Sequence, residues 1–100
     1  MSYEKLVRLV ERFVEDEETR VWANKRGVLN LTKGNDHVMG VRVGEEVADA
    51  MASELLACRV CGCGLEEALA RVTLVGLASG LPLEYAERVL CELVRLAGLG

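Results

Sequence analysis

Apolar residues recur at helical spacing over residues 3–14, and charged residues take the opposite face, which predicts an amphipathic helix. Val21 keeps the phase of this stripe, seven residues after its last valine. The pattern therefore predicts that the helix runs on to residues 25–26 and stops at Gly27. A break near residues 16–19 is the alternative.

Two stretches in which apolar and polar residues alternate, 28–32 and 37–43, flank the turn-forming residues 33–36 and predict a β-hairpin. A two-stranded hairpin is marginally stable in water, so it must lie on the helices or pair with a second copy of itself. The only tryptophan, Trp22, lies off the main stripe of the predicted first helix. It either covers the core or stacks at an interface, and we favour the core.

The remaining chain has the pattern of three helices. The first follows Gly44 and has an acidic first turn, the second spans about Leu65–Ser79, and the third about Leu83–Ala97. The middle helix carries no charge after Arg71, and a helix that is apolar on every side is buried in its domain or against a partner. This helix and the unsupported hairpin both favour a homodimer.

The predicted architecture is one domain over residues 1–100 that is mainly α and belongs to the α+β class. It has an N-terminal helix, a β-hairpin and three C-terminal helices, the last two joined by a tight turn.

The charge along the chain is uneven. The net charge is −4, yet residues 20–44 carry five basic groups and one acidic group, whereas residues 45–100 carry four basic and nine acidic groups. The basic stretch is either ordinary scatter around a turn or a patch that binds anions or nucleic acid. In the second case we expect phosphates to be contacted by Lys25, Arg26, Lys33 and Arg42.

A short segment joins the last two predicted helices. Gly80 can adopt the positive φ of a tight turn, Leu81 can pack inward, and Pro82 suits a helix start. Residues 72–97 thereby resemble the paired helices of helix-turn-helix and winged-helix regulators. The resemblance implies duplex DNA binding with Arg88 among the contacts, or a scaffold of the same shape used for dimerisation or protein binding.

The start of the last helix departs from that family. Glu84 and Glu87 stand where side chains would approach DNA, and carboxylates repel the phosphates on which duplex affinity mostly depends. The turn is therefore evidence about packing first and about DNA second.

Four cysteines allow three interpretations. The spacing of Cys58, Cys61 and Cys63 can hold zinc or another metal, with Cys91 or His37 as the fourth ligand. A disulfide that involves Cys61, Cys63 or Cys91 is the second interpretation, because Cys91 shares a helix face with charged residues. In the third, the thiols pack as small apolar side chains.

Other chemistry is sparse. No nucleophile, base and orienting group stand at a meaningful spacing, so we expect no enzyme and no cofactor other than zinc. We see no secretion signal, and the longest uncharged run, residues 72–83, is too short for a membrane span, so a cytoplasmic location is expected. The absence of Ile and Gln and the excess of Arg over Lys are typical of a GC-rich genome and favour a heat-adapted protein.

The leading functional expectation is a small regulator-like or adaptor protein with a helix-turn-helix-like C-terminal half, with nucleic acid as a candidate ligand. Two alternatives remain. One is a structural or protein-interaction subunit, and the other is a cysteine-based metal or redox protein.

Overall fold

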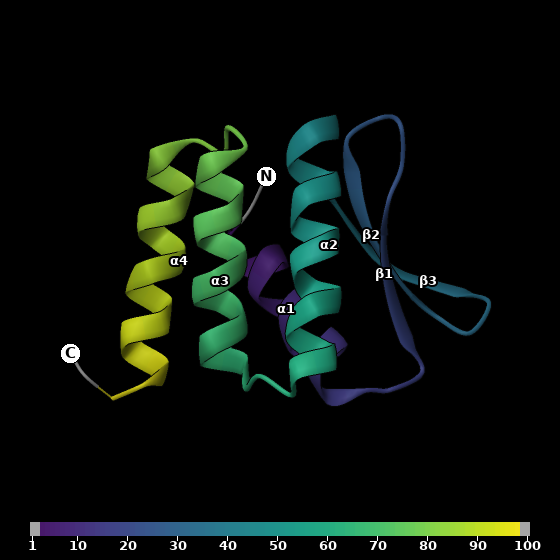
Figure 1. The fold of residues 1–100 in the computed structure, drawn as a ribbon, viewed down its shortest axis with the longest axis horizontal. Helices are drawn as coiled ribbons and strands as arrows, with labels where there is room; N and C mark the ends of the chain where they lie inside the picture. The colour runs from purple at the N-terminus through teal and green to yellow at the C-terminus, as the bar shows by residue number, and fades with distance from the viewer. Residues whose placement is uncertain (1–2, 99–100) are drawn as a thin grey trace.

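The chain folds as a helix, an antiparallel sheet and three further helices. This structure, a computed structural model, describes residues 3–98. In chain order the elements are α1 (Tyr3–Glu15), β1 (Thr19–Ala23), β2 (Val28–Lys33), β3 (Asp36–Arg42), α2 (Glu45–Cys61), α3 (Leu65–Ala78) and α4 (Leu83–Leu96). Figure 1 shows α2, α3 and α4 side by side, α1 behind them, and the sheet next to α2. The α+β class and the order of elements are as the pattern predicts.

The sheet has a third strand that the sequence pattern hides. Its order is β1-β2-β3, and both pairs are antiparallel, so the predicted hairpin is the β2–β3 pair. The prediction that the first helix reaches residues 25–26 is wrong, because α1 ends at Glu15 and β1 follows. Asp16 forms the intervening turn: its carbonyl accepts from Thr19 N at 3.0 Å, and its carboxylate accepts from Glu18 N at 3.0 Å.

The position of Trp22 changes with this correction. In a strand, successive side chains point to opposite faces. Val21 and Ala23 pack against the core, and Trp22 between them is 44% exposed. The expectation that Trp22 covers the core is therefore wrong.

The core lies between the four helices and one face of the sheet. Its largest fully buried side chains come from α1, from all three C-terminal helices and from the inner face of β2 and β3: Leu6, Leu9, Phe13, Leu29, Leu31, Val41, Met51, Leu55, Leu69, Val72 and Val89. Arg59 of α2 connects this core to the sheet. Its guanidinium lies 4.2 Å from the centre of the Phe13 ring, and its Nη1 donates to the carbonyl of Thr19 at the start of β1.

The turn between α3 and α4 has the features that its sequence predicts. Gly80 has a φ of +112°, and Leu81 is buried and donates its N–H to the carbonyl of Gly76 at 2.7 Å. Figure 1 shows α3 and α4 antiparallel and side by side, whereas helix-turn-helix pairs cross at about 90–120°. The turn closes an antiparallel helix hairpin.

None of the helices within residues 3–98 is both long enough and apolar enough to cross a lipid bilayer.

Candidate functional site

The outer face of the sheet carries a tryptophan among arginines. The helices cover the inner face, where Leu29, Leu31 and Val41 are buried. The alternation along β1 places Arg20 and Trp22 on the opposite, outer face. We call this surface the basic sheet face and define it by Arg20, Trp22 and Arg42 with the turn residues Lys25 and Arg26.

Three rows of residues cross the basic sheet face. The strand register puts Trp22 opposite Asn30 and, on the next strand, Gly40. Neighbouring strands lie about 4.8 Å apart, so each row is about 10 Å wide. From one end of the sheet to the other, the rows are Asn24–Val28–Arg42, Trp22–Asn30–Gly40 and Arg20–Thr32–His37.

The middle of this face is a fixed polar pair. His37 donates from Nε2 to Asn30 Oδ1 at 2.8 Å, and Asn30 donates from Nδ2 to the carbonyl of Val28 at 3.1 Å. A Cβ at Gly40 would lie 3.2 Å from Val28 Cγ1 and 3.3 Å from Asn30 Oδ1. Because residue 40 is a glycine, the Asn30–His37 pair has room beside Trp22.

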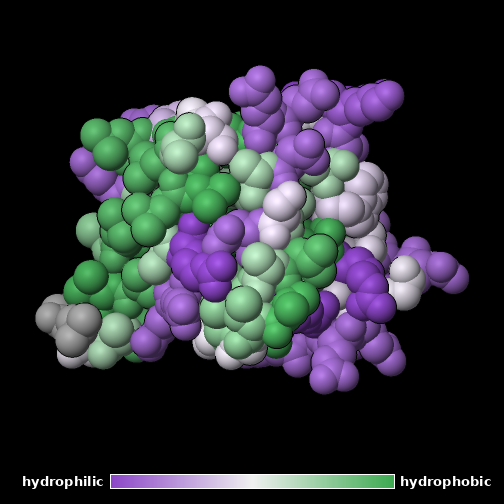
Figure 2. Space-filling view, viewed as in Figure 1, coloured by the Kyte–Doolittle hydropathy of each residue, from purple (hydrophilic) through white to green (hydrophobic). Residues whose placement is uncertain are grey.

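The β1–β2 turn gathers three cations at one end of the sheet. Gly27 has a φ of +78°, and its carbonyl accepts from Val43 N and Gly44 N, both at 2.9 Å. Arg42 Nη1 donates to the carbonyl of Arg26 at 3.2 Å. These bonds tie the turn to the end of β3, so Lys25, Arg26 and Arg42 lie together. In Figure 2, hydrophilic residues cluster over this end of the sheet.

Two of the cations expected at phosphates lie elsewhere. Lys33, at the opposite end of the sheet, pairs with Asp16 at 3.0 Å. The hydrogen bond between them lowers the pKa of Asp16 and raises that of Lys33. Arg88 is on α4, on the far side of the molecule from the sheet, and lies 5.9 Å from the centre of the Tyr3 ring. Lys33 and Arg88 therefore lie outside the basic sheet face, and their contact with nucleic acid stays a prediction.

Two members of the basic sheet face, Arg20 and Trp22, were not among the residues that the sequence pattern assigned to phosphates or bases. The signal for them is local: Thr19, Val21 and Ala23 alternate with these two exposed residues over five positions. That alternation is typical of a half-buried strand. It is masked because Val21 also fits the helical phase of the preceding segment.

The cysteines do not assemble into the predicted metal site. Within the part of the chain that is described, no three His, Cys, Asp or Glu side chains gather closely enough to hold a metal ion. Cys91 is exposed on α4, which α3 separates from the end of α2 (Figure 1). His37 bonds to Asn30 on the sheet. The disulfide set of Cys61, Cys63 and Cys91 stays a prediction.

A different pair of cysteines comes together where α2 ends. Gly62 is left-handed, Gly62 N donates to Arg59 O at 3.1 Å, and Cys63 N donates to Cys58 O at 2.9 Å. This is a Schellman motif, in which the residue after the glycine contacts the residue four positions before the glycine. Here both are cysteines, and the half-buried Cys63 interacts with the buried Cys58.

Arg71 of α3 completes this cluster. Its Nη1 donates to Cys63 Sγ at 3.1 Å, and its Nε donates to Glu54 Oε1 at 2.6 Å. Burial, followed by smaller effects that include Cys63, raises the pKa of Cys58 to about 11. The two thiols therefore have different surroundings: one is buried among apolar side chains, and the other touches a guanidinium.

The helical layer has an outer surface of another character. Large apolar side chains are exposed on all three C-terminal helices, and Val60 is 80% exposed, Leu83 65% and Leu74 62%. Figure 2 shows hydrophobic atoms over α3 and α4 and over the lower part of α2, with hydrophilic atoms between the two areas. We call this surface the apolar helix face and define it by Leu56, Val60, Leu74, Leu83, Leu90 and Val94.

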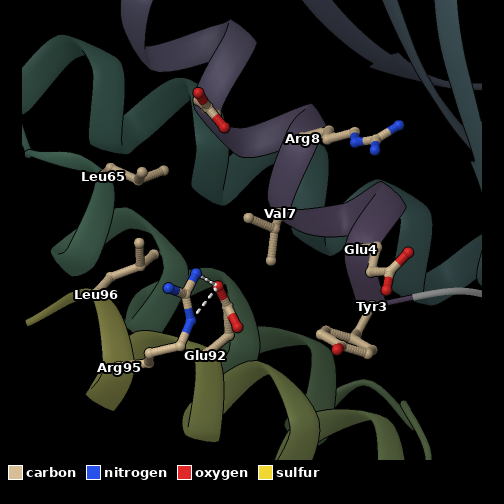
Figure 3. Close-up of a pocket in the computed structure, with 9 residues that line it drawn as sticks. Tyr3, Glu4, Val7, Arg8, Leu65, Glu92, Arg95 and Leu96 are labelled. Atoms are coloured by element: carbon tan, nitrogen blue, oxygen red, sulfur yellow. Dashed lines mark hydrogen bonds and ion pairs between the residues drawn. The ribbon is translucent and has the colours of Figure 1, made fainter.

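A hollow of about 390 Å³ lies between α1 and α4. Figure 3 shows Tyr3, Val7 and Leu65 beside the Glu92–Arg95 ion pair. Arg95 Nε donates to Glu92 Oε1 at 3.0 Å, and the bond lowers the pKa of Glu92. Because the two charges neutralise each other, this ion pair offers a ligand less unpaired charge than the cations of the basic sheet face do.

Comparison of the chain with protein-family models, with curated proteins and with solved structures finds no match.

Proposed function

We propose that this protein binds single-stranded nucleic acid through its basic sheet face. The observation that carries the proposal is Trp22, the only tryptophan of the chain, which is 44% exposed on a strand with Arg20 two residues away on the same face. An indole has a large apolar face and a polar edge, which suits an exposed tryptophan to contact with a ligand.

An exposed tryptophan on a sheet is a platform for a base. Proteins that bind single strands combine aromatic rings, on which bases stack, with cations that follow the backbone. Around Trp22, Arg20 lies along the strand, and the cluster of Lys25, Arg26 and Arg42 lies at the end of the sheet. Arg20 Nη1 donates to the carbonyl of Glu17 at 2.7 Å, so this cation is held at one end of the face and the cluster at the other.

Charge distribution supports the same surface. Residues 20–44 carry five basic groups and one acidic group, so the negative charge comes from the helices and from the turn of Asp16, Glu17 and Glu18. The sheet lies at one end of the helical layer (Figure 1). A polyanion can therefore approach the basic sheet face while most of the carboxylates lie outside the contact.

The sheet geometry favours single strands over duplex. A duplex presents stacked bases whose faces are inaccessible, and its major groove is read by a helix or a β-ribbon that enters it. Trp22 lies within a row of the sheet and offers its ring to an unstacked base.

The test is a titration with a single-stranded oligothymidine and with a duplex of the same length, read by the fluorescence of Trp22 and by mobility shift. We expect binding of the single strand at about 50 mM salt and a slope of log affinity against log salt of about −3, as about four cations contacting phosphates require. Failure of both nucleic acids to bind under these conditions would refute the proposal.

Matched variants separate the surface from total charge. Arg42→Gln and Arg88→Gln each remove one positive charge, the first from the basic sheet face and the second from α4. We expect only Arg42→Gln to weaken binding and to make the salt slope shallower by about 0.7. Equal effects of the two variants would show that binding follows net charge and not this surface.

The apolar helix face favours a second function, self-association as a homodimer. Its six large apolar side chains come from three adjacent helices, and their outer surface shows two hydrophobic areas with hydrophilic atoms between them (Figure 2). Exposed apolar areas rimmed by polar residues are typical of protein–protein contacts. The Arg71–Glu54 pair beside it is internally neutralised. Two acidic copies can therefore approach through this face with little charge repulsion, which makes a second copy the occupant that we propose.

Light scattering of the wild type across a concentration series tests the dimer. Leu74→Glu places a charge on the apolar helix face, and Val38→Glu makes the corresponding change at an exposed apolar residue of β3. We expect Leu74→Glu to weaken association by at least about tenfold, because the charge would be buried in the dimer, and Val38→Glu to leave it unchanged. A wild-type monomer at high concentration would refute this second proposal.

A further inference from the structure

The end of α2 holds two thiols whose contact is set by the backbone. In a Schellman motif the residue after the left-handed glycine contacts the residue four positions before that glycine, and the contact is ordinarily apolar. The bond from Cys63 N to Cys58 O, at 2.9 Å, fixes the two backbones next to each other. This backbone bond and the hydrogen bond between the two thiols place Cys58 and Cys63 in contact, which is the starting condition for a disulfide.

The two thiols differ in access. Cys63 is half-buried and accepts a hydrogen bond from Arg71 Nη1 at 3.1 Å, whereas Cys58 is fully buried. Arg71 therefore contacts the accessible thiol, whereas burial raises the pKa of the Cys58 thiol to about 11. Glu54 holds Arg71 in place through a bond of 2.6 Å. The arrangement gives one thiol the attacking role and the other the resolving role.

We propose that Cys58 and Cys63 form a reversible intramolecular disulfide by exchange with a small-molecule disulfide such as oxidised glutathione. The Cys63 thiolate attacks one sulfur of the small disulfide, forms a mixed disulfide and releases one small thiolate. Cys58 then loses its proton to solvent and attacks Cys63 Sγ, which releases the second small thiolate. Two electrons pass from the protein dithiol to the small molecule, which is reduced to two thiols.

The other two cysteines have no such partner in the described residues. Cys61 is exposed on the last turn of α2, and Cys91 is exposed on α4. They serve as internal references, since each can take up the small thiol without a neighbour to displace it. The pair proposed here differs from the disulfide prediction from the sequence, which named Cys61, Cys63 and Cys91.

The test uses three variants of the full chain, each retaining two cysteines. Cys61→Ser with Cys91→Ser leaves the proposed pair, Cys58→Ala with Cys91→Ser leaves Cys61 and Cys63, and Cys63→Ser with Cys91→Ser leaves Cys58 and Cys61. Each is reduced, exposed to oxidised glutathione and examined by intact mass and by tryptic mapping. Cleavage after Arg42, Arg59 and Arg71 puts Cys58 in peptide 43–59 and Cys63 in peptide 60–71.

We expect the first variant to lose two hydrogen atoms in mass and to yield the two peptides linked. The second should retain a glutathione adduct on Cys63, because the resolving thiol is absent. Persistent free thiols or a lasting adduct in the first variant would overturn the proposal, as would a Cys61–Cys63 linkage formed at the same rate in the second. Circular dichroism of each variant confirms that the result reports on a folded chain.

A further pair of variants tests Arg71 as a positioning residue. In Arg71→Gln we expect alkylation of Cys63 relative to Cys61, measured within one peptide, to fall by about tenfold, as loss of a charged hydrogen bond implies. Arg71→Lys should recover part of that ratio. An unchanged ratio in both variants would show that the guanidinium does not activate Cys63.

Discussion

The basic sheet face and the apolar helix face are built by the same rule and have opposite chemistry. Each is the side of an element that the core does not use. On the sheet that side carries Arg20, Trp22 and Arg42, and on the helical layer it carries Leu74 and Leu83 among other apolar residues. A chain with a net charge of −4 thus concentrates cations on one surface and leaves another without net charge. The difference shows that two kinds of contact are available to one small fold.

The largest predicted effect concerns the turn that positions the cations next to the helical layer. A Cβ at Gly27 would lie 2.6 Å from the backbone of Gly44 and of Glu45, and Gly27 has a φ of +78°. We expect Gly27→Ala to lower the free energy of unfolding by more than about 3 kcal/mol. Urea denaturation followed by circular dichroism measures it.

Gly34→Ala is the matched control for this change. Gly34 also has a positive φ, of +60°, but nothing lies within 4 Å of its Cβ position. We expect it to cost about 1 kcal/mol, the strain of a left-handed residue alone. Equal losses from the two variants would mean that the contact between turn and helix start does not hold the two regions together.

The next effect concerns Arg59, which joins α2 to the strand that carries Trp22. Its guanidinium stacks on Phe13 and donates to Thr19 O, and burial lowers the pKa of Arg59. We expect Arg59→Ala to destabilise the fold by about 2 kcal/mol, and Arg59→Met by about 1 kcal/mol because it keeps the apolar stem. Thermal and urea unfolding check the order. Arg12→Ala, on the exposed side of α1, should have little effect, and if it matched Arg59→Ala the assigned role would fail.

A pair of truncations tests whether the two faces are independent. Trp22→Ala should weaken binding of single-stranded DNA by about tenfold through lost stacking, and Trp22→Phe should restore most of the affinity. Leu74→Ala should leave that affinity unchanged and weaken self-association instead. Binding is measured by fluorescence anisotropy of a labelled oligonucleotide and association by light scattering. If either truncation altered both properties, the faces would be one surface functionally.

The smallest effect concerns the Asp16–Lys33 pair, at the end of the sheet opposite the β1–β2 turn. The pKa of Asp16 is lowered from its ordinary 3.8, so its contribution to stability is present above that value and is lost as pH falls through the lower folded value. The pKa of Lys33 is raised from 10.5, so its contribution persists to pH 10.5 and is lost above it. As the pH is lowered from 6 to 2, the urea midpoint of Asp16→Asn should therefore fall less than that of the wild type.

The same variant tests how far the binding surface extends. Asp16→Asn leaves Lys33, which lies outside the basic sheet face, without its ion-pair partner, so affinity for single strands should rise by no more than about twofold, the size of an exposed ion pair. Asp49→Asn, an exposed carboxylate of α2, gives the charge-matched control. Equal gains from both variants would attribute the effect to net charge alone.

Most of the fold could be predicted because its signals are local. The apolar stripe of α1, the alternation in β2 and β3 and the glycine at position 80 each depend on nearby residues. The strand β1 could not, because five residues between two turns fit both periods and its pairing with β2 decides between them. Because Trp22 belongs to that strand, the main residue of the candidate site was misplaced with it.

The cysteines also show what local sequence patterns cannot predict. Spacing alone allows a metal set from Cys58, Cys61 and Cys63 with a fourth ligand elsewhere, since three thiols lie within six residues. The structure decides by direction: Gly62 turns the chain so that Cys63 meets Cys58 and Cys61 faces solvent. One cysteine directly after a helix-ending glycine and another four residues before it are a sequence signal that could have indicated the pair.

The most direct test of the central claim, that the sheet binds a base on its outer face, is the fluorescence of Trp22. Because the chain has one tryptophan, its emission reports on this face alone. Titration with single-stranded oligothymidine at about 50 mM salt should quench the emission and saturate, and added salt should reverse it with a slope of about −3. Emission that stays constant while the oligonucleotide binds would place the nucleic acid elsewhere, and no binding at all would contradict the proposed function.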